Sequence, residues 1–254
     1  MSATLIFDIE TIPDVETGKR LNPELAKLSN DDAQQALVAI RQEEAGSDFM
    51  RLPLHKIACI SFLWVEDNQL TLKTLSLNDM SEEQILTTFF RAFNKQPTLV
   101  SWNGTGFDVP VLLYRAMLHK LSAPALFNPK QRPDYLYRYG DMHIDLMDKL
   151  SMFNGYNRQT LDVVASLCGF AGKQDVNGSM VVDLVKADEW DNLHTYCESD
   201  VLNTWLIYLR WQLLVGNIDN EQATYLEQST KEYLCAHTNE AGNITHQKFL
   251  DAWA

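Results

Sequence analysis

The stretch LIFDIETIPD, residues 5–14, combines the apolar pattern of a buried strand with acidic residues. Its apolar residues predict a buried β-strand over 4–9, yet Asp8 and Glu10 interrupt the run. Residues two apart on a strand project from the same face, so both carboxylates should point the same way. An edge strand with a solvated face explains this segment equally well. Burying the acids would cost several kcal/mol unless they had partners.

Two further acidic residues stand at the edges of other expected elements. In SWNGTGFD, residues 101–108, a strand ends, glycines permit a tight turn, and Asp108 begins a helix. The helix dipole favours an acid there, and simple capping is the alternative role. In YCESD, residues 196–200, Tyr196 and Asp200 are four positions apart on one helical face. That pair alone would also fit a surface tyrosine and a solvated acid.

Taken together, these acids predict a metal centre. A strand, a strand-to-helix turn and a late helix can converge over one sheet. Four carboxylates cannot all stay ionised near one another unless cations compensate them. Hard oxygen ligands select Mg²⁺ or Mn²⁺, and two such ions stabilise the attacking and leaving oxygens of phosphodiester hydrolysis.

The composition limits the remaining classes. The chain has 254 residues, 46% of them hydrophobic, and a net charge of −13, which weighs against broad coating of nucleic-acid backbones. No apolar run approaches the roughly 20 residues of a membrane span, and the N-terminus does not resemble a signal peptide. The four cysteines form no CxxC pair. We therefore expect a reduced, cytoplasmic protein without a membrane partner.

Hydrophobic periodicity predicts an α/β fold: a mixed sheet of about five strands with helices on both faces. Three strands come early, and helices and strands then alternate. Strands are expected at 4–9, 56–66, 69–77 and 98–102, with a fifth running into a turn within 143–150, and helices at 22–44, 81–95, 108–121, 160–170, 191–214 and 220–237.

The segments FDIET, NGTGFD and YCESD resemble, in this order, the three motifs of the DEDD 3′–5′ exonucleases, which have a ribonuclease-H-like fold. More narrowly, the chain resembles stand-alone bacterial proteins related to the proofreading domain of family B DNA polymerases. The similarity runs from about residue 4 to about residue 210. It implies an exonuclease domain over 1–215 and a C-terminal helical extension over 216–254 packed on it. Residues 15–55 depart from the family as an insertion of unknown role, which could be a lid over the active site, a dimer surface or a substrate guide.

The resemblance also implies roles for individual residues. Asp8, Glu10, Asp108 and Asp200 match the four metal-ligating acids, and the cofactors would be two Mg²⁺ or Mn²⁺ ions. Tyr196 matches the tyrosine that orients the attacking water, which places the chain in the tyrosine branch. The other branch has a histidine where this chain has Thr195, and His194 is interpreted as a surface residue. The terminal nucleotide would be bound by four residues: Thr11, Ile12, Asn103 and Phe107.

Other residues are interpreted with two alternatives each. Asp145 and Asp148 either support the metal site or lie solvated in a turn, whereas His143 is expected to be a hydrogen-bonded histidine and no ligand. Basic and aromatic residues at 130–139 suggest a loop where single-stranded substrate enters, or a loop that packs its own tyrosines. These residues are Lys130, Arg132, Arg138, Tyr135, Tyr137 and Tyr139, with Lys173 as a second candidate phosphate contact.

The leading hypothesis is a metal-dependent exonuclease that releases nucleoside 5′-monophosphates from single-stranded or frayed DNA 3′ ends. An exoribonuclease with the same site is the nearest alternative, because the motifs do not report how a 2′-hydroxyl is treated. A catalytically silent nucleic-acid-binding or polymerase-associated module is a second alternative. A polymerase or repair protein is the expected type of partner. An unrelated phosphoesterase fits less well, because the usual histidine-rich ligand set is absent.

Overall fold

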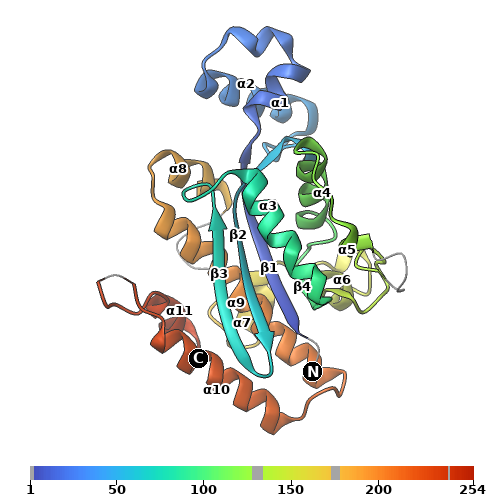
Figure 1. The fold of residues 1–254 in the computed structure, drawn as a ribbon, viewed down its shortest axis with the longest axis vertical. Helices are drawn as coiled ribbons and strands as arrows, with labels where there is room; N and C mark the ends of the chain where they lie inside the picture. The colour runs from blue at the N-terminus through green and yellow to red at the C-terminus, as the bar shows by residue number, and fades with distance from the viewer. Residues whose placement is uncertain (1–2, 128–133, 173–177, 240) are drawn as a thin grey trace.

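A computed structural model describes residues 3–127, 134–172, 178–239 and 241–254. Its centre is a mixed five-stranded sheet with the strand order β3-β2-β1-β4-β5 (Figure 1). The first three strands pair antiparallel, and β4 and β5 run parallel to β1. The predicted α/β fold class is thereby confirmed. The strands are β1 (Thr4–Pro13), β2 (His55–Glu66), β3 (Gln69–Ser76), β4 (Thr98–Ser101) and β5 (His143–Asp145).

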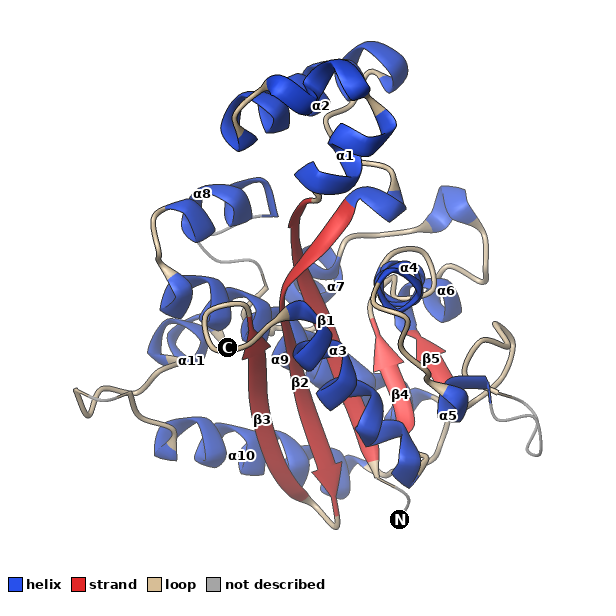
Figure 2. Cartoon of the chain, turned by 45° about the horizontal axis from the view of Figure 1, so that its top comes forward, coloured by secondary structure: helices blue, strands red, loops and turns tan. Residues whose placement is uncertain are grey.

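Helices cover both faces of the sheet (Figure 2). One face packs against α3 (Glu82–Arg91) and α4 (Asp108–Leu118), in a core that includes Leu5, Phe7 and Ile9. The other face packs against α9 (Trp190–Leu214), in a core that includes Ile6. The alternation of β1 thus sends successive side chains into two different cores, as expected for a central strand.

The strand β1 extends further than its apolar run predicts. It continues through Asp8 and Glu10 to Pro13, and the pairing with β2 shifts register between Glu10 and Thr11. Such a bulge bends a strand and changes where its side chains point. The two acids lie on the α9 face, between Ile6 and Ile12, so they are directed under a helix.

Several turn and cap predictions are confirmed. Asp67 and Asn68, the DN pair between β2 and β3, both have positive φ, as a two-residue hairpin requires. Ser81 forms a capping box with Gln84 at the start of α3. Gly216 has a φ of 80°, just after the end of α9.

The expected helix over 22–44 is wrong in its boundaries. The chain forms α1 (Val15–Leu21), a short 3₁₀ turn (Pro23–Lys27) and α2 (Asn30–Ala45). Ser29 caps α2 by accepting a hydrogen bond from the Asp32 amide, so α2 begins at Asn30, after the 3₁₀ turn that Pro23 starts. We name residues 15–54 the cap segment; it projects beyond one end of the sheet (Figure 1).

A buried ion cluster anchors the cap segment to the sheet. Arg115 on α4 forms ion pairs with Asp14, at the start of α1, and with Glu82, at the start of α3. His119 contacts the same Glu82 carboxylate at 2.8 Å. These side chains, apart from His119, are at most 6% exposed. Removing one partner from such a cluster leaves an uncompensated buried charge, which is strongly destabilising.

The remaining helices connect and extend this framework. α10 packs against α9, where the indole of Trp205 donates a hydrogen bond to Thr230. The division of the chain at residue 215 stays a prediction. No helix in the described residues is long and apolar enough to span a membrane. The remaining helices of the fold are α5 (Pro124–Phe127), α6 (Leu146–Leu150), α7 (Leu161–Leu167), α8 (Val181–Lys186), α10 (Asn220–Ala236) and α11 (Gln247–Ala252). Short 3₁₀ turns lie at Leu52–Leu54, Ala92–Lys95, Gly155–Asn157 and Gly178–Met180.

Candidate metal centre

The first two acids lie together beneath α9. Carboxylate oxygens of Asp8 and Glu10 and the Sγ of Cys197 lie within 4.8 Å of one another. The Cys197 thiol is 3.6 Å from an Asp8 carboxylate oxygen. Burial is the main reason that the pKa of Cys197 is raised well above its ordinary value, so this side chain stays a neutral thiol. The negatively charged oxygens of this group therefore belong to Asp8 and Glu10 on β1.

The side chain of Asp108 is hydrogen-bonded to the same strand, β1. It is the first residue of α4, and its Oδ1 accepts a hydrogen bond from the Ile9 amide at 3.2 Å. The side chain is buried, with 3% of its surface exposed. This contact places the carboxylate beside β1, between the positions of Asp8 and Glu10 in the chain. Capping alone would not explain a link from a helix start to a strand amide.

The loop that carries Asp108 is held by Asp145, at the end of β5. The Asp145 carboxylate accepts hydrogen bonds from the backbone amides of Asn103 and Thr105 and from the Thr105 hydroxyl, at 2.6–3.0 Å. It also caps α6 by accepting from the Asp148 amide. Asp145 and Asp148 are 4% and 2% exposed, so of the two alternatives the solvated turn is wrong. The neighbouring His143 forms a hydrogen bond with Ser101 at 2.7 Å, as expected for a hydrogen-bonded histidine.

Tyr196 and Asp200 come from α9 and lie one helical turn apart. Burial is the largest cause that raises the pKa of the Tyr196 phenol above its ordinary value, and the negative charges of Asp200, Glu10 and Asp8 add to it. This electrostatic link places Tyr196 close to three of the acids. The phenol is therefore protonated at neutral pH and acts as a hydrogen-bond donor.

The acids repel one another strongly. Burial raises the pKa of Asp8 well above its ordinary value, and the charges of Asp108, Asp200 and Glu10 raise it further. Burial likewise raises the pKa of Asp108 to about 7, with contributions from Asp145 and Asp200. Asp108 and Asp200 do not belong to the group of Asp8, Glu10 and Cys197, but their negative charges still raise the pKa of Asp8. This donor set fits a hard divalent cation, because a cation would relieve the repulsion among these carboxylates.

The four residues expected to bind the terminal nucleotide have different environments. Thr11 Oγ1 lies 2.8 Å from His55 Nδ1, and Ile12 packs with Tyr196 in a small apolar cluster. Asn103 has a positive φ of 62° at the strand-to-helix turn, where it begins the loop that Asp145 holds.

Phe107, the fourth of these residues, belongs to an aromatic group beside the same turn. Its ring lies edge-on to His55 at 5.0 Å and tilted to Phe49 at 5.5 Å. Phe49, which the sequence alone does not single out, comes from the cap segment and is 53% exposed. The structure thus adds an exposed ring from the cap segment next to the residue that precedes Asp108.

The basic and aromatic segment at 130–139 is only partly described. Tyr135 is buried and donates a hydrogen bond to the Pro97 carbonyl, so it belongs to the core. Tyr137 and Tyr139 are exposed, with ring centroids 6.2 Å apart. Arg138 is engaged with Asp148 through two hydrogen bonds. Lys130, Arg132 and Lys173 lie outside the described residues.

A second buried network adjoins α9. Glu198, two residues before Asp200, accepts a hydrogen bond from the Thr74 hydroxyl at 2.7 Å, and His246 Nε2 lies 3.1 Å from the same carboxylate. His194 is half-buried and its Nε2 is enclosed, so the interpretation as a surface residue is wrong. Nothing in the sequence around Glu198 indicates this network, because only the fold brings β3, α9 and residue 246 together.

Comparisons with known proteins identify the family of the chain. A family described as a predicted 3′–5′ exonuclease related to the exonuclease domain of PolB matches residues 47–253. The match begins after β1, so Asp8 and Glu10 lie outside it. DNA polymerase 1 of Sulfolobus acidocaldarius is 24% identical over 225 residues, which cover 80% of this chain and 22% of that protein.

The fold is also similar to that of the family B DNA polymerase from the archaeon Pyrobaculum calidifontis. The TM-score is 0.54 at 16% identity, and the match covers 100% of this chain and 27% of the polymerase. The chain thus spans about a quarter of the length of these polymerases or less. Because the family match extends over most of the described fold, the chain belongs to the family of predicted 3′–5′ exonucleases related to the exonuclease domain of PolB.

Proposed function

We propose that the chain is a metal-dependent 3′–5′ exonuclease that removes single nucleotides from single-stranded or frayed DNA 3′ ends. The observation that carries the proposal is the electrostatic state of the acids. Asp8 and Asp108 both have raised pKa values, because burial and their acidic neighbours disfavour the charged forms. A silent binding module would gain nothing from this repulsion, whereas a cation site depends on it.

In the proposed mechanism, Asp8, Glu10, Asp108 and Asp200 would hold two Mg²⁺ or Mn²⁺ ions. Bound cations of this kind lower the pKa of water and stabilise the oxygens of a phosphodiester under attack. The protein's own contribution is to fix the carboxylates: Asp108 through the Ile9 amide, and its loop through Asp145. Hydrolysis at the terminal phosphodiester would release nucleoside 5′-monophosphates.

Tyr196 would position the attacking water. Its raised pKa keeps the phenol protonated, so it can donate a hydrogen bond but cannot remove a proton at neutral pH. Packing against the small apolar cluster that includes Ala58 and Val181, together with the position of Tyr196 within α9, limits where the hydroxyl can lie. Orientation of a nucleophile is by itself a large contribution to rate.

The terminal nucleotide would lie beside Thr11, Ile12, Asn103 and Phe107. Thr11 and Ile12 directly follow Glu10, Phe107 directly precedes Asp108, and Asn103 lies five positions before Asp108 in the same turn, so these residues are near the proposed metal ligands in the chain. The exposed ring of Phe49 next to Phe107 offers an apolar surface on which a base can stack. The cap segment would in this arrangement guide the substrate end.

The direct test uses single-stranded DNA labelled at either end, with Mg²⁺, Mn²⁺ or EDTA. Wild type should shorten the 5′-labelled strand stepwise and release the 3′ label as a mononucleotide, and Asp8→Ala should abolish both. A matched control is Asp251→Ala, which changes an exposed acid on α11. Internal cleavage, or activity that persists in EDTA, would contradict the proposal.

The same assay separates the DNA and RNA alternatives. RNA of identical sequence is included in parallel, and the ratio of kcat/KM between the two sugars is measured. A preference for DNA supports the proposal as stated, and a preference for RNA assigns the same site to an exoribonuclease. The sugar specificity depends on contacts to the 2′-hydroxyl, which the acidic motifs do not determine.

A further inference from the structure

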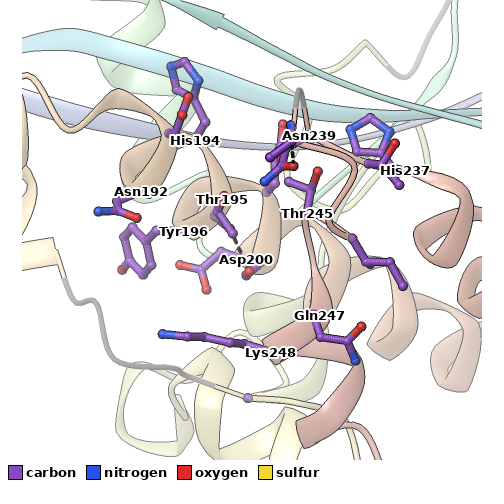
Figure 3. Close-up of a pocket in the computed structure, with 17 residues that line it drawn as sticks. Asn192, His194, Thr195, Tyr196, Asp200, His237, Asn239, Thr245, Gln247 and Lys248 are labelled. Carbon is purple, nitrogen blue, oxygen red and sulfur yellow. Dashed lines mark hydrogen bonds between the residues drawn. The ribbon is translucent and has the colours of Figure 1, made fainter.

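A cavity of about 910 Å³ lies beside the candidate metal centre (Figure 3). One side is formed by the N-terminal half of α9, including Tyr196 and Asp200. The other side is a stretch near the C-terminus, residues 237–239 and 241–248, which we name the C-terminal wall. This volume is at the upper end of the range for small-molecule sites, so it is large enough for a nucleotide.

The cavity is continuous with the candidate centre. Tyr196 and Asp200 line it, and both also line a smaller adjoining cavity of about 160 Å³ with Asp162 and Asn203. In Figure 3, the side chains of Tyr196 on α9 and Lys248 on α11 extend toward the same opening. A strand whose last phosphodiester lies at the acids needs a path for its remaining nucleotides, and this cavity begins at two of the same residues.

The C-terminal wall is fixed in place before any ligand binds. His246 is 1% exposed and contacts the buried Glu198 of α9, which is itself bonded to Thr74 of β3. An isolated β-bridge joins Thr238 to Ile244, and the Asn239 side chain accepts from backbone amides across the turn. A preformed wall reduces the entropy lost on binding.

The chemistry of the lining suits the sugar and phosphate of a nucleotide. Hydroxyl and amide side chains are the most frequent in it, and three acids, Asp191, Glu198 and Asp200, also line it. Lys248, which already has a partner in the structure, provides an ammonium group on an exposed helical turn. The acid Glu198 is already committed to His246 and Thr74. An ammonium group contributes a strong, charge-assisted contact to a phosphate oxygen.

We propose that this cavity binds the penultimate nucleotide of the substrate, with Lys248 contacting the phosphate on its 5′ side. This inference rests on the proposed exonuclease function and adds a subsite to it. The terminal nucleotide and its scissile phosphate remain at the acids. The cavity thus makes the enzyme sensitive to one phosphate that takes no part in the reaction.

Two dinucleotides that differ only in this phosphate test the proposal: pdTpdT, which has a 5′-phosphate, and dTpdT, which lacks it. For wild type we expect kcat/KM to be about tenfold higher for pdTpdT, as for a single charged hydrogen bond. Lys248→Ala should reduce this ratio to near one, and Lys248→Arg should retain most of it. The control Lys231→Ala changes a cation on α10 that stacks on Trp253 outside the cavity lining, and it should keep the full ratio.

Affinities for the two dinucleotides, measured by calorimetry with Ca²⁺ in place of Mg²⁺, give the same ratio without turnover. A wild-type ratio near one, or a ratio that Lys248→Ala leaves unchanged, would overturn the subsite. Failure of wild type to hydrolyse labelled single strands would instead overturn the proposed function. A change in the ratio for Lys248→Ala in a protein with unaltered circular dichroism excludes misfolding as the cause.

Discussion

Asp8 shows how burial and neighbouring acids together disfavour a charge at this site. Burial raises its pKa, and three acidic neighbours raise it further, so its ionised form is unfavourable in the folded chain without cations. The Cys197 thiol lies 3.6 Å from its carboxylate. The side chain is retained at a cost to folding, which is the usual situation of a functional group in a site that needs charge.

The first prediction follows from this cost. Asp8→Asn removes one charge from the repelling group, so in EDTA at pH 8 the variant should unfold at a higher temperature than wild type, by about 2–4 °C for about 1 kcal/mol. Addition of Mg²⁺ should raise the Tm of wild type through binding to the folded state and should raise that of the variant much less. Scanning calorimetry with and without metal measures both effects. Equal metal-induced shifts in the two proteins would show that Asp8 holds no cation.

The second prediction concerns Tyr196. If the phenol orients water and does not accept a proton, Tyr196→Phe should reduce kcat less than Asp8→Ala does, since the variant keeps the ring and loses one hydrogen bond. We expect a reduction of about 10²-fold or less. Single-turnover hydrolysis of a labelled oligonucleotide gives the rate of the chemical step. Equal losses in the two variants would contradict the positioning role.

The sequence motifs were informative at the residue scale because each acid has a local signature. The spacing of Asp8 and Glu10 places both on one strand face, and the spacing of Tyr196 and Asp200 places both on one helix face. Asp145 and Glu198 have no such signature: their importance comes from a loop amide and a β3 hydroxyl that are distant in the chain. Only the fold reveals partners of this kind.

At the scale of elements, the turn from β4 into α4 decides where Asp108 lies. Gly104 occupies this turn, and a Cβ atom there would come within 2.3 Å of the Ser101 Oγ and 2.6 Å of its Cβ. The Ser101 hydroxyl is itself bonded to the buried His143. Neither neighbour can move easily, so the turn accepts only glycine without rearrangement.

The third prediction is therefore that Gly104→Ala is destabilising, by about 1–3 kcal/mol, because the added methyl group forces the backbone to shift. The shift should also displace Asp108 and lower activity. Gly155→Ala is the control, since a Cβ atom at that position meets nothing within 4 Å. Urea unfolding and oligonucleotide hydrolysis are measured for both. A Gly104→Ala protein with wild-type stability would show that the turn is not restricted in this way.

Asp148 on α6 connects three segments and leads to a prediction about pH. Burial would by itself raise its pKa, but hydrogen bonds from Arg138, Arg158 and Thr105 outweigh burial and hold the pKa below its ordinary value. A lowered folded-state pKa stabilises the protein above the unfolded-state pKa of about 3.9 and ceases to do so as the pH falls through the folded-state value.

The fourth prediction compares wild type with Asp148→Asn. At pH 7 the variant should be less stable by about 1–3 kcal/mol, because two arginines lose a charged partner. The difference should shrink below about pH 4 and vanish once Asp148 is protonated. Chemical unfolding of both proteins between pH 3 and 7 measures the difference, and other titrating groups cancel in it. A difference that stays constant over this range would contradict the assigned pKa direction.

Element boundaries were predictable where local chemistry sets them. The capping box at Ser81 and the positive φ at Asp67 and Asn68 are local features, and α3 and the β2–β3 hairpin appear where expected. The helix expected over 22–44 is instead divided, because the Ser29 hydroxyl caps a new helix. The continuous helical pattern over 22–44 gave no indication that Ser29 caps a separate helix within it.

At the scale of the whole molecule, the cap segment and the sheet have separate cores. Two large clusters enclose the sheet, whereas a small cluster of Leu25, Ala33, Leu37, Met50 and Leu54 holds the cap segment together. The segment is joined to the remainder through the Arg115 ion cluster, a Lys186–Asp31 pair, the contact of Phe49 with Phe107 and the packing of Leu52 against one sheet core. The sequence indicated that residues 15–55 are an insertion. It could not show that this segment has a core of its own, because the residues that form a core are determined by tertiary contacts.

The fifth prediction is that the cap segment opens without unfolding of the sheet. Leu37 is 4% exposed and lies against Gly18, where an added Cβ atom would meet its Cδ1 at 2.3 Å. Leu37→Ala should remove about 2–5 kcal/mol from the small cluster, so amides of α1 and α2 should exchange hydrogen much faster. Amides of β1 and β2 should keep their wild-type rates, since their protection depends on the sheet cores. In the control Leu206→Ala, a substitution in the α9 core, exchange should accelerate throughout the sheet. Mass-spectrometric exchange on peptides from 15–45 and 55–66 distinguishes the two patterns, and equal acceleration of both regions by Leu37→Ala would mean that the cap segment and sheet unfold as one unit.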